Sequence, residues 1–181
     1  MSIMIKPLSL TVNGKSVGPI DVPETIPMLN FLHEYLNLTG TRLGCGQGIC
    51  RACAVIVDGA GGTSQEMRTC INSAHSFAGK SVRTVEAHAK RDADGNVVEL
   101  SPIQQAFVEH FSFQCGYCTP GFVNSATVLL ERLQRNPVAR KDVEAAIDDT
   151  LGQHICRCTG YVRYFAAMRD VILSKPSLLR D

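Results

Sequence analysis

Residues 44–53 read GCGQGICRAC and place Cys45, Cys50 and Cys53 in the spacing C-x4-C-x2-C. A fourth cysteine, Cys70, lies further along the chain. One long loop with three thiolates and a distant fourth cysteine is the arrangement that binds a plant-type [2Fe–2S] cluster. The two glycines between the first two cysteines suit a backbone that must wrap closely around such a cluster. The spacing therefore predicts that Cys45, Cys50, Cys53 and Cys70 bind a [2Fe–2S] cluster.

Two other uses of these cysteines compete with that interpretation. A structural zinc site is usually built from two short C-x2-C-like knuckles, which the four-residue gap and the lone distant cysteine fit poorly. Disulfides are typical of short secreted chains, and the N-terminus MSIMIKP has no hydrophobic targeting core or twin-arginine pair. We therefore expect the chain to be made and loaded with metal in the cytoplasm.

Composition and charge exclude several classes of function. The 181 residues carry a formal net charge of +1 and are 45% hydrophobic, so a packed core is expected without an affinity for nucleic acid. No apolar run approaches the roughly 20 residues of a membrane-spanning helix, and direct membrane insertion is not expected. Nothing in the sequence defines a catalytic triad, a phosphate loop or a carboxylate pair, so no catalytic residue is predicted.

The first half of the chain is predicted to be a ferredoxin domain of the β-grasp type, residues 1–86. Alternating hydrophobic residues predict strands at 4–12 and 15–22, joined by an Asn13-Gly14 hairpin turn. An apolar stripe predicts a helix that includes residues 28–36. Further strands are predicted at three places, residues 52–57, 64–70 and 81–85.

The second half is predicted to be helical, in residues 101–181, after a polar linker at 87–100. Ser101-Pro102 predicts a helix start, as does Thr119-Pro120. Two more helices are expected at about 140–151 and 161–173, and Thr119 and Thr159 are expected to act as helix caps. The whole chain is thus predicted to be α+β, with the ferredoxin domain followed by a four-helix bundle.

The remaining cysteines form two pairs, Cys115/Cys118 and Cys156/Cys158, each just before a predicted helix. Helix N-termini present free N–H donors and a positive dipole end, so they would stabilise an anionic cluster and its reduced state. A second [2Fe–2S] cluster is one interpretation of this set, and a structural zinc ion is the other. His154 precedes Cys156 closely, but four thiols already complete a site.

The two cysteine sets together closely resemble the small iron–sulfur subunit of the xanthine oxidase/aldehyde oxidoreductase family of molybdenum hydroxylases. The resemblance rests on CGQGICRAC at 45–53, Cys70, QCGYCTPG at 114–121 and ICRCTGY at 155–161. It covers essentially residues 8–173. It implies that Cys115, Cys118, Cys156 and Cys158 bind a second [2Fe–2S] cluster.

The resemblance also implies a place in an assembly. The helical-domain cluster would lie nearest a molybdopterin cofactor that a large partner subunit holds, with Gln114 and Cys158 approaching the pterin. The ferredoxin-domain cluster would pass electrons outward, to a flavin subunit or a c-type cytochrome subunit. One departure is Arg51, where the family often has glycine; its side chain is expected to point outward. Because flavin and molybdenum domains are missing, we expect the chain to be one subunit of a larger oxidoreductase.

The resulting interpretation is an electron-transfer subunit of a molybdenum hydroxylase or dehydrogenase that acts on an aldehyde or an N-heterocycle. The alternative is a free-standing two-cluster ferredoxin that shuttles electrons between unrelated enzymes, and the near-neutral charge disfavours its acidic docking surface. A zinc-stabilised interaction module is a third class. If the acceptor is a cytochrome, export to the periplasm on a partner's signal is expected.

Overall fold

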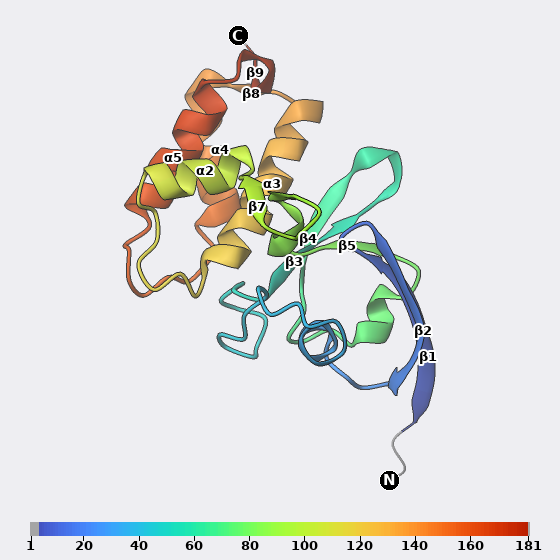
Figure 1. Cartoon of the computed structure of the whole chain (residues 1–181). Helices are drawn as coiled ribbons and strands as arrows, with labels where there is room; N and C mark the ends of the chain where they lie inside the picture. The colour runs from blue at the N-terminus through green and yellow to red at the C-terminus, as the bar shows by residue number, and fades with distance from the viewer. Residues whose placement is uncertain (1–3, 181) are drawn as a thin grey trace.

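The computed structural model describes residues 4–180; the expected outer domain limits, residues 1 and 181, lie outside the described residues. Figure 1 shows a mixed sheet from the first half of the chain and a group of helices from the second half, lying side by side. The fold is α+β, as predicted. No helix within residues 4–180 has the length and hydrophobicity that crossing a bilayer requires.

The main sheet has five strands in the order β2-β1-β5-β3-β4. Its strands are β1 Ile5–Val12, β2 Lys15–Pro23, β3 Ala54–Asp58, β4 Ser64–Arg68 and β5 Ser81–Arg83. β1 and β5 run parallel, whereas the other neighbours are antiparallel. The predicted hairpin turn is confirmed, since Asn13 and Gly14 both have a positive φ, 52° and 76°.

The predicted first helix is shorter and less regular than its apolar stripe indicated. A single turn, α1 (Met28–Asn30), continues into a π-helix, η1 (Phe31–Tyr35). Phe31 and Leu32 are fully buried against the sheet, so the stripe was correctly assigned to the core. Packing against the sheet decides the geometry of this segment more than helix propensity does.

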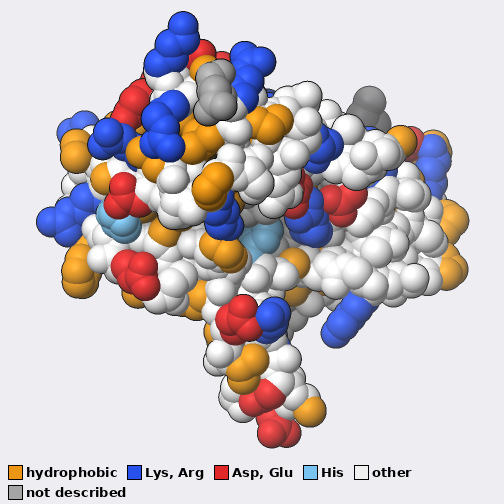
Figure 2. All heavy atoms as spheres, turned by 90° about the horizontal axis from the view of Figure 1, so that it is seen from above, with side chains coloured by type: hydrophobic (Ala, Val, Ile, Leu, Met, Phe, Trp, Pro, Cys, Tyr) orange, Lys and Arg blue, Asp and Glu red, His pale blue; other side chains and the backbone are white. Residues whose placement is uncertain are grey.

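The stretch predicted as a linker has a structure of its own. Between a turn of 3-10 helix, η4 (Val85–Ala87), and the helical half, β6 (Lys90–Arg91) pairs with β7 (Val97–Glu99). Residues 90–99 are all exposed, and the hairpin forms the narrow projection in Figure 2, where acidic, basic and hydrophobic side chains mix.

The second half contains four α-helices: α2 Pro102–Glu109, α3 Thr119–Arg135, α4 Val143–Leu151 and α5 Val162–Leu173. They share one core, whose largest fully buried side chains are Phe107, Phe122, Leu129, Ile147, Leu151 and Tyr164. A short parallel pair, β8 (Val138–Ala139) with β9 (Leu179–Arg180), closes the far end. The other single turns of 3-10 helix are η2 Ala60–Gly62, η3 Ala74–Phe77, η5 Arg140–Asp142 and η6 Pro176–Leu178.

The helix starts were predicted better than the caps. Ser101 and Gln104 form a reciprocal capping box at the start of α2, which confirms the prediction for that helix. Thr119 and Thr159 are not caps, because the N-cap of α3 is Cys118 and that of α5 is Tyr161. The Thr119 hydroxyl instead lies 2.7 Å from the Tyr164 hydroxyl, inside the helical core.

The long helix α3 joins the two halves, because it packs directly on β3 and β4. Buried Asn124 donates to the Ala54 carbonyl over 2.7 Å. Further along, the Arg83 guanidinium lies 2.7 Å from both the Asp58 and the Glu131 carboxylates. The sheet and the helices therefore form one packed body in which the two cysteine-bearing regions have a fixed relation.

Candidate metal centres

The first cysteine loop is wrapped around the sulfur of Cys45. This Sγ accepts hydrogen bonds from the backbone N–H groups of Gln47, Ile49 and Cys50 at 3.3, 3.4 and 3.4 Å. Gly46 and Gly48 adopt φ values of 68° and 71°, which let the backbone wrap closely, as the sequence predicted, and turn these N–H groups inward. N–H groups aimed at a sulfur stabilise a negative charge on it.

The loop also brings a second thiol to Cys45. The Cys45 N–H donates to the Cys50 Sγ over 3.3 Å. Hydrogen bonds from the backbone of Cys50 and Gln47 lower the pKa of the Cys45 thiol to about 6. The thiolate is the form that binds metal, so this site is electrostatically prepared for a metal centre.

Cys53 and Cys70 form the second pair of this loop. The Thr69 N–H and hydroxyl both donate to the Cys53 carbonyl, at 3.2 and 2.9 Å, and they hold the next residue, Cys70, against Cys53. Burial raises the pKa of the Cys53 thiol, and the neighbouring Cys70 thiol raises it further. Such a thiol needs a cation beside it to become a thiolate.

The second cysteine set is gathered from two distant segments. The Cys158 and Cys115 sulfurs lie 3.6 Å apart, and both residues are exposed. The other two thiols, Cys118 and Cys156, are buried and contact each other. Cys118 is the N-cap of α3, and the Cys156–Cys158 segment leads into α5, so both pairs lie at helix N-termini as predicted.

The buried thiols of this second set are tuned in opposite directions. Burial raises the pKa of Cys118 to about 12. Burial would also raise the pKa of Cys156, but the Thr159 hydroxyl, 3.1 Å from its sulfur, holds that pKa below its usual value. Thr159, expected to be a cap, therefore supports a cysteine sulfur instead.

The thiols of residues 4–180 meet in pairs, and no three Cys, His, Asp or Glu side chains in that range form a group around one point. A [2Fe–2S] cluster takes two thiolates at each iron, whereas a structural zinc ion takes four ligands around one centre. The donor set, eight cysteine thiols in four neighbouring pairs, fits two [2Fe–2S] clusters.

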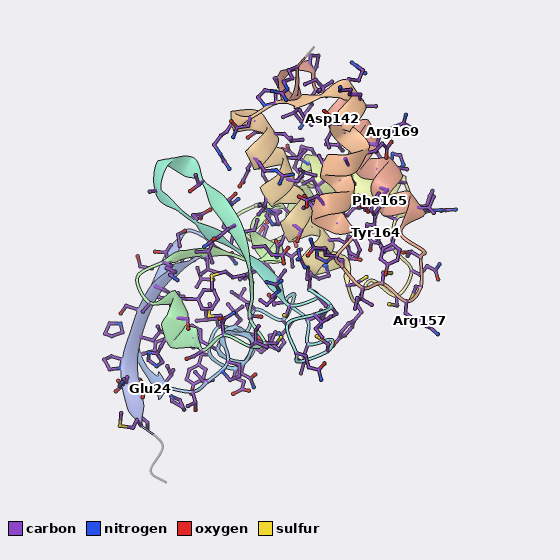
Figure 3. All side chains as sticks on the ribbon, turned by 180° about the vertical axis from the view of Figure 1, so that it is seen from behind. Glu24, Asp142, Arg157, Tyr164, Phe165 and Arg169 are labelled. Atoms are coloured by element: carbon purple, nitrogen blue, oxygen red, sulfur yellow. The ribbon has the colours of Figure 1, made fainter. Side chains whose placement is uncertain are left out.

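The two residues expected to approach a pterin lie together at the surface. Gln114 donates from Nε2 to the Cys158 carbonyl over 3.0 Å, and both residues are exposed. In Figure 3 the neighbouring Arg157 points away from the fold, at the edge of the helical half. The bond uses the Gln114 amide nitrogen, so the amide oxygen of this exposed residue can still accept a hydrogen bond.

The expectation for Arg51 is wrong. Its side chain does not point outward but is only 15% exposed, with Nη1 3.4 Å from the Glu66 carboxylate. Its Nη2 donates to Gln153 in the helical half. The physical reason is electrostatic: turned inward, the guanidinium pairs with the Glu66 carboxylate and the Gln153 amide oxygen.

The contacts between the two cysteine loops could not be read from the sequence. The Ile155 N–H donates to the Cys50 carbonyl over 3.2 Å, and the Tyr117 hydroxyl donates to the Leu43 carbonyl over 2.7 Å. Buried His154 stacks on Phe122 with ring centroids 4.5 Å apart. These contacts join residues far apart in the chain, so no local sequence pattern predicts them.

Comparison with known proteins finds two family matches along the chain. Residues 10–75 match the family described as "2Fe-2S iron-sulfur cluster binding domain". Residues 84–169 match the family described as "[2Fe-2S] binding domain". The chain thus has two [2Fe–2S]-binding domains, and the match of the helical half favours iron–sulfur over the zinc alternative.

Individual relatives cover most of the chain. It is 38% identical to the nicotine 6-hydroxylase small subunit of Paenarthrobacter nicotinovorans, over 90% of this chain and 87% of that one. It is 33% identical to the aldehyde oxidoreductase iron–sulfur-binding subunit PaoA of Escherichia coli K12, over 92% of this chain and 71% of that one.

A solved structure agrees in fold as well. A chain of quinoline 2-oxidoreductase from Pseudomonas putida 86 superposes with a TM-score of 0.75 at 31% identity, covering 96% of this chain and 93% of that one. The paired thiols, the two matched domains and these relatives together show an electron-transfer role within an oxidoreductase complex. The chain belongs to the family of small iron–sulfur subunits of the xanthine oxidase/aldehyde oxidoreductase molybdenum hydroxylases.

Proposed function

We propose that this chain relays electrons from a molybdopterin site on a large partner subunit through two [2Fe–2S] clusters to an acceptor subunit. The observation that carries the proposal is the hydrogen bond from Ile155 N–H to the Cys50 carbonyl, 3.2 Å long. Ile155 adjoins Cys156 of one cysteine set, and Cys50 belongs to the other. A single hydrogen bond therefore joins the two candidate centres, which gives electrons a short path between them.

The cysteine pairs indicate which thiols would share an iron. In the ferredoxin half these are Cys45 with Cys50, and Cys53 with Cys70. In the helical half they are Cys115 with Cys158, and Cys118 with Cys156. When bound, each cluster supplies one-electron redox chemistry.

The helical half would favour the reduced state of its centre. α3 starts beside Cys118, and α5 starts four residues after Cys158, so in this proposal the four helices act as a bundle that directs N-termini at the site. The positive end of a helix dipole stabilises added negative charge. We therefore expect a potential above the roughly −400 mV that is typical of plant-type ferredoxins.

Electrons would enter at the face that carries Gln114 and Cys158. The amide of Gln114 can donate to and accept from a pterin edge, and its 3.0 Å bond to the Cys158 carbonyl positions it. Phe111 and Val162, each 72% exposed, are available nearby in sequence for contact with the large subunit. In this proposal the large subunit covers both side chains, which removes their apolar surface from water.

Electrons would leave at the ferredoxin loop. Leu43, Ile49 and Ile71 lie within two residues of cluster cysteines and are 51–58% exposed. This rim would contact the acceptor, a flavin subunit or a c-type cytochrome subunit. The relatives' names mention nicotine, quinoline and aldehydes, which supports an N-heterocycle or an aldehyde as the substrate of the large subunit.

The test uses the complex as the cell makes it. The full chain, tagged and purified anaerobically from its own organism, is assayed for molybdenum and then mixed with aldehydes and N-heterocycles. We expect molybdenum to accompany the chain, and one of these substrates to bleach the visible iron–sulfur absorption. A molybdenum-free chain that exchanges electrons with unrelated redox proteins would instead establish the shuttle ferredoxin.

A further inference from the structure

We propose that Arg51 is a positioning residue, which clamps the two cysteine-bearing loops together where electrons cross between them. The inference rests on the proposed function, because it assumes that both loops carry clusters. Arg51 directly follows Cys50, and its side chain reaches across the domain interface to Gln153. It therefore acts on a segment that leads into Cys156.

The backbone at Arg51 adopts a conformation that is unusual for a side chain of this size. Its φ of 60° lies in the left-handed region, where glycine is the residue of least strain. The loop could keep this conformation with glycine, so the backbone alone gives no reason for an arginine. The side-chain contacts supply that reason.

The guanidinium is held in a nearly closed polar site between the two halves. Nη1 lies 3.4 Å from the carboxylate of Glu66 in β4, and the two side chains are only 15% and 13% exposed. The same carboxylate accepts from the Ser125 hydroxyl of α3 and lies 3.8 Å from the His154 Nε2. Glu66 is thus shared by the sheet, by α3 and by the cysteine loop.

The second terminal nitrogen of the Arg51 guanidinium contacts the helical half. Nη2 donates to the Gln153 Oε1, and the Gln153 side chain donates in turn to the Asp149 carbonyl, 3.2 Å away, at the end of α4. Two residues later, Ile155 N–H donates to the Cys50 carbonyl. Cys50 and Arg51, adjacent residues of the ferredoxin loop, therefore both form hydrogen bonds with the 153–155 segment.

These two hydrogen bonds affect electron transfer because they restrict the 153–155 segment. A lone backbone hydrogen bond at an exposed loop opens easily, since Ile155 is 52% exposed. A planar guanidinium that contacts a carboxylate and an amide at once restricts the same segment in position and orientation. Because electron transfer slows steeply as its path lengthens, loss of the Arg51 contacts should slow exchange between the clusters while both clusters stay bound.

The experiment compares variants of the full, cluster-loaded chain. Arg51→Gly relieves the backbone strain and removes both contacts, so it should fold and bind iron as the wild type does. We expect weaker magnetic coupling between the two reduced clusters in EPR. We also expect the rate of electron exchange between them, after pulsed one-electron reduction, to fall on the order of tenfold, less than the roughly hundredfold cost of a 1 Å misplacement of reacting groups.

Two further variants separate position from charge. Arg51→Lys keeps the charge, so the reduction potential of the ferredoxin cluster should match that of the wild type. The coupling should stay low, because an ammonium lacks the planar fork. Gln153→Ala leaves Arg51 in place and should lower the coupling in the same way; it carries the test if Arg51→Gly does not fold. Arg135→Ala is the matched control, since Arg135 also crosses the interface, to the Gly62 carbonyl, at the end of α3 opposite Cys118.

Each outcome decides between explanations. Wild-type coupling and exchange rate in Arg51→Gly or in Gln153→Ala would overturn the positioning role. Full recovery of coupling and rate in Arg51→Lys would overturn it too, in favour of an effect of charge alone. A wild-type chain that lacks one cluster contradicts the proposed function itself, and iron content reveals that failure separately.

Discussion

Cys50 is the residue at which the two candidate centres meet. Its sulfur accepts the Cys45 N–H over 3.3 Å, and its carbonyl accepts the Ile155 N–H over 3.2 Å. The side chain and the backbone carbonyl of Cys50 therefore have different roles. The sulfur would bind iron, whereas the carbonyl holds the helical half in place.

Cys50→Ser separates these tasks, because it removes one thiolate and keeps the carbonyl. We expect iron to fall from about four to about two per chain, since each cluster holds two irons. The EPR signal of the helical-half cluster should persist, and turnover with the physiological acceptor should fall sharply. Full turnover by this variant would show that the ferredoxin cluster is not the outward path.

Gly121 is a residue at which a small addition would separate the two halves. It lies in the first turn of α3, and a Cβ there would stand 2.3 Å from the Arg51 carbonyl oxygen. In an unhindered helix glycine to alanine stabilises by about 1 kcal/mol. Here the neighbour is backbone and cannot rotate away, so the sign reverses.

Gly121→Ala should therefore lower the free energy of unfolding by at least about 2 kcal/mol through overpacking. Thermal unfolding of the cluster-loaded chain, followed by circular dichroism, measures this loss. Gln134→Ala, at an exposed position of the same helix, is the control and should stay within about 0.5 kcal/mol of the wild type. Stabilisation by Gly121→Ala would contradict the close approach of α3 to the cysteine loop.

Residue-scale features were predictable from the sequence where chemistry dictates spacing. The C-x4-C-x2-C loop and its glycines could be recognised, because a cluster requires neighbouring thiolates and a tightly wound backbone. Arg51 and Gly121 could not be understood in this way. Gly121 meets the Arg51 carbonyl 70 positions earlier, and the Arg51 side chain reaches Gln153, 102 positions later; local sequence contains no information about either contact.

At the scale of elements, α3 is the helix that unites the molecule. Its N-terminus bears Cys118, and its middle is bound to the sheet through Asn124. The Asn124 Oδ1 also lies 2.7 Å from the Nε2 of His88, which follows η4. Since Nδ2 of Asn124 donates to a carbonyl, its Oδ1 accepts from a neutral His88.

This packing predicts a dependence of stability on pH. Burial lowers the pKa of His88 in the folded chain below its unfolded value of about 6.5. The unfolded chain therefore takes up this proton more readily, and stability is lost as the pH falls from about 6.5 toward the folded pKa. The loss is at most about 1.4 kcal/mol per pH unit from this group.

His88→Gln keeps a donor for Asn124 but does not titrate. The drop in melting temperature between pH 8 and pH 5.5 should be smaller in this variant than in the wild type. His154, whose pKa burial lowers to about 3, is present in both proteins and contributes equally. An identical drop in the two proteins would mean that His88 is not buried in its neutral form.

Elements were predicted well in kind and less well in detail. The starts of α2 and α3 were correct because proline and its preceding residue mark a helix N-terminus locally. The π-helix after α1 and the left-handed Tyr161 before α5, with a φ of 69°, were missed. Both depart from regular helix geometry because tertiary packing overrides local propensity.

At the scale of the whole molecule, the sheet and the helices form one frame that holds eight thiols in four neighbouring pairs. Ion pairs such as Arg83 with Asp58 and Glu131 brace the frame away from the cysteines. The β6–β7 hairpin, expected as an unstructured connection, projects from it. The order of the two domains could be predicted from the cysteine sets, whereas their packing through α3 required the structure.

Both halves of this frame are expected to carry a [2Fe–2S] cluster. Low-temperature EPR of the purified, dithionite-reduced chain, with iron and zinc determined on the same sample, tests it most directly. Two clusters should give two distinct S = 1/2 signals and about four irons per chain. A single signal with about two irons and bound zinc would contradict it and leave only the ferredoxin half as a redox centre.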